Sequence, residues 1–424
     1  MPLGDTPFEM NHWQKWFAAG LFGFLSCASS LAEQPGTPFV MMSWELPPRA
    51  PGFDDPRTGL ASLVDCGFNV AAFVQASQVP QCKDLGLKAM IRIDPWRLDW
   101  RQLSDEQIDK HVAQLIQNTS NDPTVLGYFL EDEPGTGDFP GLAKAVAAIK
   151  RLAPGKIAYI NLFPDYATLG APDLSQLGAD SYEQYLEQYV SEVHPQFISY
   201  DNYRIEYSQD LQKPEIAASY FQNLLQVRQI AMKHALPFWN IVSSNQIRRG
   251  ASPPSPANLL LQAYTTLAAG AKGITWYTYY SGSYAYSPID GAGHKSATWS
   301  YLKMVNDQVR TLTPVMADLT STGVYFTSAF AGQSLPALPG QLVKKVDSQT
   351  PVMVGEFRAA NGDAYAMIVN ISLERSAKVQ LELATGLNIS GQISPADGNL
   401  LSIDQDNSLW LPAGQGALLK ISPK

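Results

Sequence analysis

The sequence predicts an α/β protein in which a closed (β/α)8 barrel (TIM barrel) is followed by a small C-terminal antiparallel β-sandwich. Short apolar stretches alternate with helical stretches eight times over roughly 280 residues, which is the proportion of such a barrel. An open doubly wound sheet would usually carry a glycine-rich phosphate loop after its first strand, and the sequence has none there. Beyond residue 313 the hydrophobic pattern changes to an alternation of period two, which indicates antiparallel strands.

The eight predicted strands are short and mostly apolar, as buried parallel strands are. They cover residues 39–45, 68–75, 87–94, 125–134, 157–163, 197–203, 237–243 and 273–279. The fourth strand runs into Glu131, Asp132 and Glu133, and Pro134 then prevents further ladder pairing. We expect it to stop at three adjacent carboxylates, which form either a functional site or an exposed or salt-bridged acidic turn.

Helical stretches separate these strands. They cover residues 59–65, 79–85, 105–118, 139–152, 181–193, 217–234, 256–269 and 296–311. The third has a clear start, because Ser104 in the N-cap position precedes Glu106 in the first turn. The barrel is therefore assigned to residues 33–313.

The last hundred residues have a different hydrophobic pattern. Residues 364–370, 378–383 and 416–421 alternate between apolar and polar side chains, with the turn signals Asn361-Gly362 and Asp397-Gly398 between them. This pattern predicts the β-sandwich, which is assigned to residues 314–424.

The N-terminal residues have the form of a secretory signal peptide. An apolar run follows Lys15 and ends in the small residues around Ala32, so we expect residues 1–32 to be removed. A secreted or periplasmic protein without a membrane span in the mature chain follows from this. A lipoprotein signal at Cys27 and a retained membrane anchor are the alternatives.

Composition narrows the choice of partners and cofactors. The formal net charge of -9 argues against a nucleic-acid partner. Outside the signal, Cys66 and Cys82 either form a disulfide or stay free, and neither has a neighbouring histidine that would suggest a metal site. We expect no metal and no cofactor, and the nine Trp and nineteen Tyr suit stacking on sugar rings. Composition makes no prediction of oligomeric state.

In a barrel of this kind the functional residues project from the C-terminal ends of the strands. The residues at those ends are carboxylates, amides and aromatics, with no cysteine, lysine or histidine among them. Schiff-base chemistry and catalytic zinc are therefore disfavoured, and no Gly-x-Ser-x-Gly elbow of a serine hydrolase is present. Cleavage of glycosidic bonds is the main chemistry that carboxylic acids perform alone.

The pair Asp132-Glu133 at the end of the fourth strand resembles the (β/α)8 glycoside hydrolases of the clan typified by families 42 and 5. The resemblance implies that Glu133 is the general acid and base, that the substrate is an extracellular oligo- or polysaccharide, and that the configuration is retained. It also implies that Trp276 on the eighth strand is a sugar platform. The C-terminal β-sandwich is similar to the small domain that many of these enzymes carry.

One departure from that clan concerns the nucleophile. The clan has a glutamate at the end of the seventh strand, whereas residues 239–246 contain no acid. Asp132-Glu133-Pro134 is similar to the Asp-Glu-Pro of family 123, in which, as in family 20, the 2-acetamido group of the substrate attacks while the Asp orients it. Tyr200-Asp201 is similar to the sixth-strand Tyr-Asp of family 18. A substrate-assisted N-acetylhexosaminidase and a carbohydrate-binding pseudoenzyme are therefore the alternatives to an ordinary glycoside hydrolase.

The candidate site residues follow from these strand ends. The predicted catalytic residues are Glu133, Asp132, Asp201 and Glu131. The predicted substrate-binding residues are Trp44, Glu45, Asp94, Tyr200, Asn202, Tyr203, Asn240 and Trp276. A structural salt bridge at Asp132, a loop cap at Asp94 and packing of the aromatics at the barrel top are the alternatives.

The direction of the three acidic side chains depends on the ladder. In a regular strand Glu131 and Glu133 share a face and Asp132 points away, whereas a β-bulge lets Asp132 and Glu133 both face the pocket. The sequence leaves this choice open.

Overall fold

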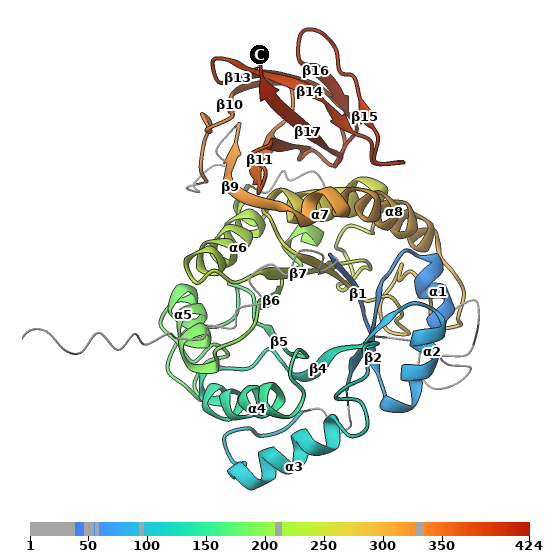
Figure 1. Ribbon diagram of the computed structural model, residues 1–424, viewed down its shortest axis with the longest axis vertical. Coiled ribbons are helices and arrows are strands. Elements are labelled where there is room, and N and C mark those ends of the chain that lie inside the picture. Colours follow the sequence, from blue (N-terminus) through green and yellow to red (C-terminus); the bar gives the residue numbers. More distant parts are fainter. Residues whose placement is uncertain (1–38, 46–54, 56–58, 93–96, 208–213, 328–334) are drawn as a thin grey trace, which may run out of the picture. The chain divides into compact units, whose positions relative to one another are not determined.

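The part of the chain that the structure describes forms a closed eight-stranded barrel followed by two antiparallel sheets (Figure 1), so the predicted fold class is confirmed. The structure is a computed structural model that describes residues 39–45, 55, 59–92, 97–207, 214–327 and 335–424. The predicted signal peptide and Asp94 lie outside these residues.

All neighbouring strands of the barrel are parallel, and β8 closes the barrel on β1. The strands are β1 (Val40–Trp44), β2 (Val70–Val74), β3 (Lys88–Ile91), β4 (Val125–Asp132), β5 (Ile157–Leu162), β6 (Ile198–Asp201), β7 (Phe238–Ser243) and β8 (Gly273–Tyr277). Each strand lies within a stretch that the sequence predicts.

Helices follow the strands in the order that a (β/α)8 barrel requires (Figure 1). The α-helices are α1 (Leu60–Asp65), α2 (Val79–Asp84), α3 (Asp105–Leu115), α4 (Phe139–Leu152), α5 (Tyr182–Val193), α6 (Pro214–Lys233), α7 (Pro256–Ala268) and α8 (Ala297–Ala317), and the 3-10 helices are η1 (Ala76–Gln78), η2 (Thr136–Asp138) and η3 (Arg204–Tyr207). As predicted, Ser104 caps α3, because its hydroxyl accepts a hydrogen bond from the backbone N–H of Gln107 at 3.3 Å.

Large side chains fill the interior of the barrel. Tyr159 stacks on Phe197 with ring centroids 5.7 Å apart, and Trp239 packs against the same Phe197 ring. Such a filled interior is a packed core and leaves no pore, so a ligand has access only at an end of the barrel.

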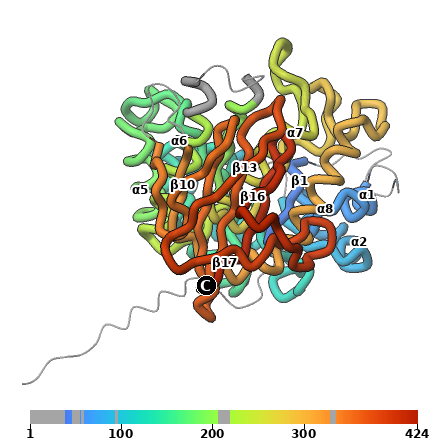
Figure 2. The backbone as a smooth tube through the Cα atoms, turned by 90° about the horizontal axis from the view of Figure 1, so that it is seen from above, coloured from blue at the N-terminus to red at the C-terminus, as the bar shows by residue number. Residues whose placement is uncertain are grey.

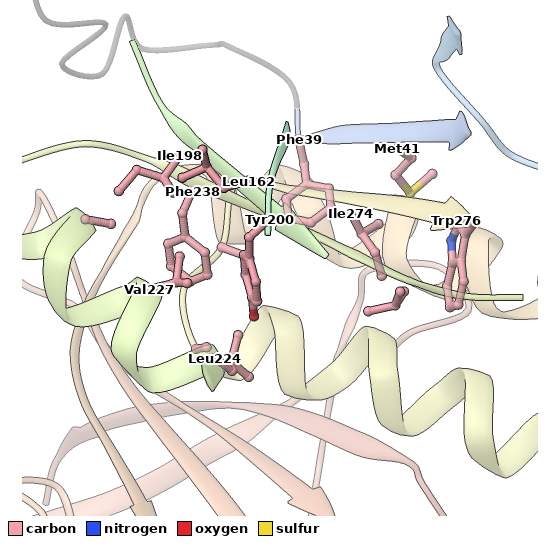
Figure 3. Close-up of a cluster of buried hydrophobic side chains, with 14 of the residues drawn as sticks. Phe39, Met41, Leu162, Ile198, Tyr200, Leu224, Val227, Phe238, Ile274 and Trp276 are labelled. Carbon is pink, nitrogen blue, oxygen red and sulfur yellow. The ribbon is translucent and has the colours of Figure 1, made fainter. Parts of the chain in front are cut away.

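A second apolar layer lies between the strands and the helices. Figure 3 shows part of it, with Ile198 and Phe238 from the barrel strands near Val227 from α6. Because side chains alternate along a strand, residues next to one another in sequence point to these two different cores. This alternation decides which strand-end residues can reach a site inside the barrel.

The C-terminal domain contains a six-stranded and a three-stranded antiparallel sheet (Figure 2). Its strands are β9 (Leu319–Phe326), β10 (Val343–Ser348), β11 (Val352–Ala359), β12 (Ala364–Asn370), β13 (Ala377–Leu383), β14 (Leu387–Ile393), β15 (Leu400–Leu401), β16 (Ser408–Leu411) and β17 (Gly416–Pro423). The spatial orders are β15-β14-β17-β12-β11-β9 and β10-β13-β16. The buried carboxylate of Glu356 on β11 accepts hydrogen bonds from the backbone N–H groups of Gln341, Leu342 and Val343, and so connects the two sheets.

Helix α8 leads from the barrel to the C-terminal sheets. It contains Pro314 and continues to Ala317, and β9 begins at Leu319, so the predicted boundary at residue 313 falls inside the helix. Cys66 and Cys82 are buried free thiols, so the disulfide that the sequence left open is not formed. No helix in the described ranges has the length and apolar character that a membrane span requires.

Candidate active site

A register shift in β4 determines where its three carboxylates point. Phe129 pairs with Tyr159 of β5, but the next paired residues are Glu131 with Ile160 and Asp132 with Asn161. One extra residue therefore stands on the β4 side of the ladder, which is a β-bulge. The bulge turns Asp132 to the inside of the barrel, where it meets Asn161.

Glu131 consequently lies on the other side of the strand. It is 7% exposed, and its Oε2 accepts a hydrogen bond of 2.8 Å from Nε1 of Trp100. Its Oε1 accepts from the backbone N–H of Asp132 at 3.1 Å. Glu131 is thus held in place by two donors at the edge of the site.

Glu133 leaves the strand in a left-handed backbone conformation, with φ of 52°. Its backbone N–H still donates to the carbonyl of Asn161 at 2.8 Å, so the residue is anchored to the end of β5. A non-glycine residue in this region of φ and ψ is uncommon, and such residues cluster at functional sites. The bulge and this conformation together bring Asp132 and Glu133 to one pocket.

Asn161 connects the acidic groups of β4 and β6. Its Nδ2 donates to Oδ1 of Asp132 at 3.0 Å and to Oδ1 of Asp201 at 3.2 Å. The hydroxyl of Ser199 donates to the Asn161 Oδ1 at 3.1 Å, which fixes the orientation of the amide. A single neutral side chain therefore holds two carboxyl groups close together at the end of the barrel.

Burial, together with repulsion from neighbouring carboxylates, raises the proton affinity of Glu131, Asp132, Glu133 and Asp201. Burial raises the pKa of Glu133 to about 7, with a further increase from the charge of Asp132 and a decrease from Arg97. Burial also raises the pKa of Glu131 to about 7 and that of Asp132 to about 6. Asp201 is 3% exposed, and burial followed by the charges of Glu133 and Asp132 holds its pKa well above the usual range.

Glu131, Asp132 and Glu133 border an open pocket of about 370 Å³. The residues that line it are Arg97, Leu98, Glu131, Asp132, Glu133, Pro134, Asp138, Phe163 and Gln176. The pocket combines carboxyl groups whose pKa values differ with one guanidinium group and an aromatic ring. Such a combination is typical of a binding site for a polar substrate on which acid and base chemistry is performed.

Several predicted binding residues lie beside this cluster. The Tyr203 hydroxyl forms a hydrogen bond with Asp201, and its ring lies 5.1 Å from that of Tyr277. Trp44 points into the barrel, where it is 6% exposed and packs edge-on against Phe73 at 4.9 Å. Glu45 is exposed, and its negative charge contributes to the raised pKa of Asp132.

Four other predicted binding residues are not brought to the site, because they have the opposite phase along their strands. Tyr200 and Trp276 are fully buried in the layer between strands and helices (Figure 3), and Nε1 of Trp276 donates to Asn306 of α8 at 2.9 Å. The Asn202 amide donates to Asn223 of α6, and the Asn240 amide donates to Thr266 of α7. These contacts correct the prediction that the four side chains contact the substrate.

The list of predicted site residues leaves out some residues that the structure places at the site. Asn161 and Tyr277 have the inward phase at the ends of β5 and β8, and this phase was the available signal. Arg97 and Gln176 come from loops and line the pocket without any such periodic signal.

The end of β7 carries hydroxyl and amide groups in place of an acid. Ser243 donates to the backbone carbonyl of Asn245 at 2.9 Å, and Ser244 donates to that of Thr278 at 3.0 Å. Among the described residues, the acids at the strand ends therefore come from β1, β4 and β6. In the same ranges no group of three or more His, Cys, Asp or Glu side chains is arranged to hold a metal ion.

No protein-family model matches the sequence, and no curated protein sequence matches it either. Solved structures resemble it at low identity. A catalytic mutant of Gan42B, a GH42 beta-galactosidase from G. stearothermophilus, aligns with a TM-score of 0.62 at 8% identity over 91% of this chain and 98% of that one. The beta-galactosidase from Bacillus circulans sp. alkalophilus aligns with a TM-score of 0.59 at 8% identity over 92% of this chain and 100% of that one.

A third beta-galactosidase, from the psychrophilic Marinomonas ef1, aligns with a TM-score of 0.48 at 9% identity over 67% of this chain. This chain spans 62% of the length of that enzyme. At such identities the first two likenesses show a shared fold, and the chemistry of this chain has to be argued from its own residues.

Proposed function

We propose that the chain is a glycoside hydrolase in which Glu133 is the general acid and base. The observation that carries the proposal is a carboxyl group with a pKa of about 7 in a pocket at the end of β4. At neutral pH a substantial fraction of this group is protonated, so it can donate a proton to the oxygen of a leaving sugar. The other strand-end side chains offer no Cys, Lys or His for a different chemistry among the described residues.

The neighbouring acids take different roles because their proton affinities differ. Asp132, with a pKa of about 6, is mostly ionised at neutral pH, whereas burial and the charges of Glu133 and Asp132 raise the pKa of Asp201 well above its usual range and disfavour its ionised form. Asp132 is then the negative charge that can stabilise a positively charged transition state. Glu131, tied to Trp100, tunes the site from its edge.

The substrate of this proposal is an extracellular oligo- or polysaccharide, and the configuration at the anomeric carbon is retained. The carboxyl groups of the pocket and the Tyr203 and Tyr277 rings offer hydrogen-bonding groups and apolar faces, which a pyranose ring needs together. Retention can be tested by NMR, which identifies the anomer of the product that forms first and compares its configuration with that of the substrate. Release of the opposite anomer would refute this part of the proposal.

A second candidate function is substrate-assisted hydrolysis of 2-acetamido sugars. The observation that favours it is the lack of an acid at the end of β7 in the described chain, together with the bulge that turns Asp132 inward beside Glu133. In this mechanism the acetamido oxygen of the substrate attacks the anomeric carbon, Asp132 orients the acetamido N–H, and Glu133 protonates the leaving oxygen.

We also propose that the protein is exported, as a secreted or periplasmic protein. The support is the apolar run after Lys15 with small residues at its end. The N-terminal sequence of protein recovered from the culture medium or periplasm tests this, and a sequence beginning at Glu33 is expected.

The experiment that tests the activity compares wild type and Glu133→Gln on 4-nitrophenyl glycosides with and without a 2-acetamido group. Loss of a general acid lowers kcat by about 10²- to 10⁴-fold, and the loss should grow as the leaving group becomes more basic. Glu183→Gln on the exposed first turn of α5 is the matched control and should keep full activity.

Four results separate the hypotheses. Turnover of 2-acetamido sugars alone, lost in Glu133→Gln, indicates substrate assistance, whereas turnover of plain glycosides indicates an enzyme-supplied nucleophile. Full activity of Glu133→Gln refutes the assignment of Glu133. Sugar binding without turnover in either protein indicates a carbohydrate-binding pseudoenzyme.

A further inference from the structure

The outer face of the three-stranded sheet differs from the rest of the C-terminal domain. Val379 and Leu409 point inward and belong to the apolar core between the two sheets. The alternate residues Lys378, Gln380 and Trp410 point outward and are exposed. These three side chains lie on neighbouring strands β13 and β16, which run side by side in Figure 2.

Trp410 is 67% exposed, which is unusual for the largest apolar side chain. A single exposed apolar residue is common on protein surfaces and carries no argument alone. Whether Trp410 belongs to a binding site depends on the residues around the indole. In the antiparallel ladder Trp410 pairs with Lys378 of β13. The indole therefore lies beside the outward-facing side chains of β13.

On that side the surface is hollowed. A pocket of about 240 Å³ is lined by Asp347, Ser348, Gln349, Lys378 and Gln380, so Lys378 borders both the pocket and the indole. The lining contains two amides, one hydroxyl and one charge of each sign.

Two of these polar groups are already held in place. Nζ of Lys378 lies 3.5 Å from Oδ2 of Asp406, and Nε2 of Gln380 donates to the backbone carbonyl of Asp406 at 3.2 Å. The loop that contains Asp406 thus fixes two side chains next to the indole. Less conformational entropy is lost on binding when polar groups are held in this way.

We propose that this outer face is a second carbohydrate-binding site, at which the Trp410 indole stacks on a sugar ring and the pocket residues form hydrogen bonds with the hydroxyls of the next ring. The distance from β16 across β13 to β10 is two strand spacings, about 10 Å, which suits a chain of sugars better than a single ring. The site combines the flat apolar face of the indole with two amides, a hydroxyl and a pair of opposite charges. An uncharged ligand that is rich in hydroxyls can contact the indole and form hydrogen bonds with these polar groups.

A second copy of this chain fits the face less well. A stable protein interface buries about 800 Å² per partner around an apolar centre, whereas the indole here is bordered by Lys378, Gln380 and the polar pocket. The proposed site shares no side chain with the barrel pocket. Only the choice of a polysaccharide as ligand draws on the proposed function.

The test is affinity electrophoresis of the full chain in native gels that contain galactan, galactomannan, xyloglucan or glycol chitin. All variants are made in the Glu133→Gln background, so that the polymer is not cleaved during the run. We expect at least one polymer to retard the protein, Trp410→Ala to weaken its binding about tenfold or more, and Trp410→Phe to keep most of it.

The matched control is Leu400→Ala, which removes an apolar side chain that is 51% exposed on the other sheet and should leave the mobility unchanged. In a wild-type background, Trp410→Ala should not alter turnover of small aryl glycosides, and its thermal unfolding should match that of wild type. No retardation by any of the four polymers, or equal retardation of Trp410→Ala and its parent, would overturn the proposal. A change of oligomeric state in Trp410→Ala without loss of retardation would overturn it in favour of a protein interface.

Discussion

Substitution of Asn161 by alanine should shift the pH dependence of catalysis. The Asn161 amide donates to Asp132 at 3.0 Å and thereby stabilises its ionised form. A hydrogen bond to a charged acceptor contributes about 1.5–3 kcal/mol, and one pH unit of pKa corresponds to about 1.4 kcal/mol. Loss of the amide should therefore raise the pKa of Asp132 from about 6 by about one to two pH units.

The size of the effect on rate follows from the two pKa values. The proposed mechanism needs Asp132 ionised and Glu133 protonated, and with pKa values of about 6 and about 7 this form makes up about 60% of the enzyme at pH 6.5. In Asn161→Ala the same form falls to between about 20% and about 2%. We expect kcat/KM at pH 6.5 to fall about 3- to 25-fold and the optimum to move from about pH 6.5 toward pH 7 or above.

The assay is a pH profile of kcat/KM for the best aryl glycoside, with Asn240→Ala as the matched control. Asn240 is also a buried barrel asparagine, but its amide donates to Thr266 on the helix side at 2.8 Å. Its loss should lower stability without moving either limb of the profile. If Asn161→Ala lowers kcat/KM by one factor at every pH, the role assigned to the amide is wrong.

The remaining predictions concern stability. Gly127→Ala should destabilise the barrel by about 1–3 kcal/mol or more in urea unfolding, because its Cβ would lie 2.2 Å from Cγ1 and 2.4 Å from the carbonyl oxygen of Ile157; an unchanged midpoint would contradict the close approach of β4 and β5. Glu133→Gln should be more stable than wild type at pH 8 and equal to it at pH 4. The native pKa of Glu133 is raised from 4.5 to about 7, so the charge that destabilises the native state is absent below about pH 4.5 and fully present above about pH 7. With allowance for partial exposure, the difference at pH 8 should be about 1–3 kcal/mol, and a difference of the same size at both pH values would argue against burial of the charge.

The order of strands and helices was predictable because each element has a local signal. Short apolar runs mark the strands, and side chains such as Ser104 mark helix starts through contacts with residues three positions away. The stop of β4 at its acidic end is equally local, since Pro134 cannot continue the ladder.

The direction of individual side chains was less predictable. The list of strand-end residues mixed both faces of each strand, and it included Tyr200, Asn240 and Trp276, which point to the helices. Extending the apolar alternation of each strand to its end would have separated these from the inward residues Asp201 and Tyr277.

Two features required information that no single strand contains. The β-bulge arises from how β4 pairs with β5, and the same pairing brings Asn161 between Asp132 and Asp201. Pairing register between strands separated by a helix depends on how both pack on the barrel interior, so the sequence left the direction of Asp132 open.

The arrangement of the acids also bears on which mechanism the site supports. In a retaining enzyme with its own nucleophile, the two carboxyl groups flank the bond at about 5–5.5 Å. Asp132 and Glu133 are consecutive residues with Cα atoms about 3.8 Å apart, so they approach a substrate from the same side of the barrel. Asp201 projects from β6, but burial and the charges of Glu133 and Asp132 raise its pKa well above the usual range, which disfavours the ionised form that a carboxylate nucleophile needs. An attacking group that comes with the substrate removes this difficulty, because Asp132 then needs only to orient an acetamido N–H, a role that suits an ionised carboxylate held by Asn161.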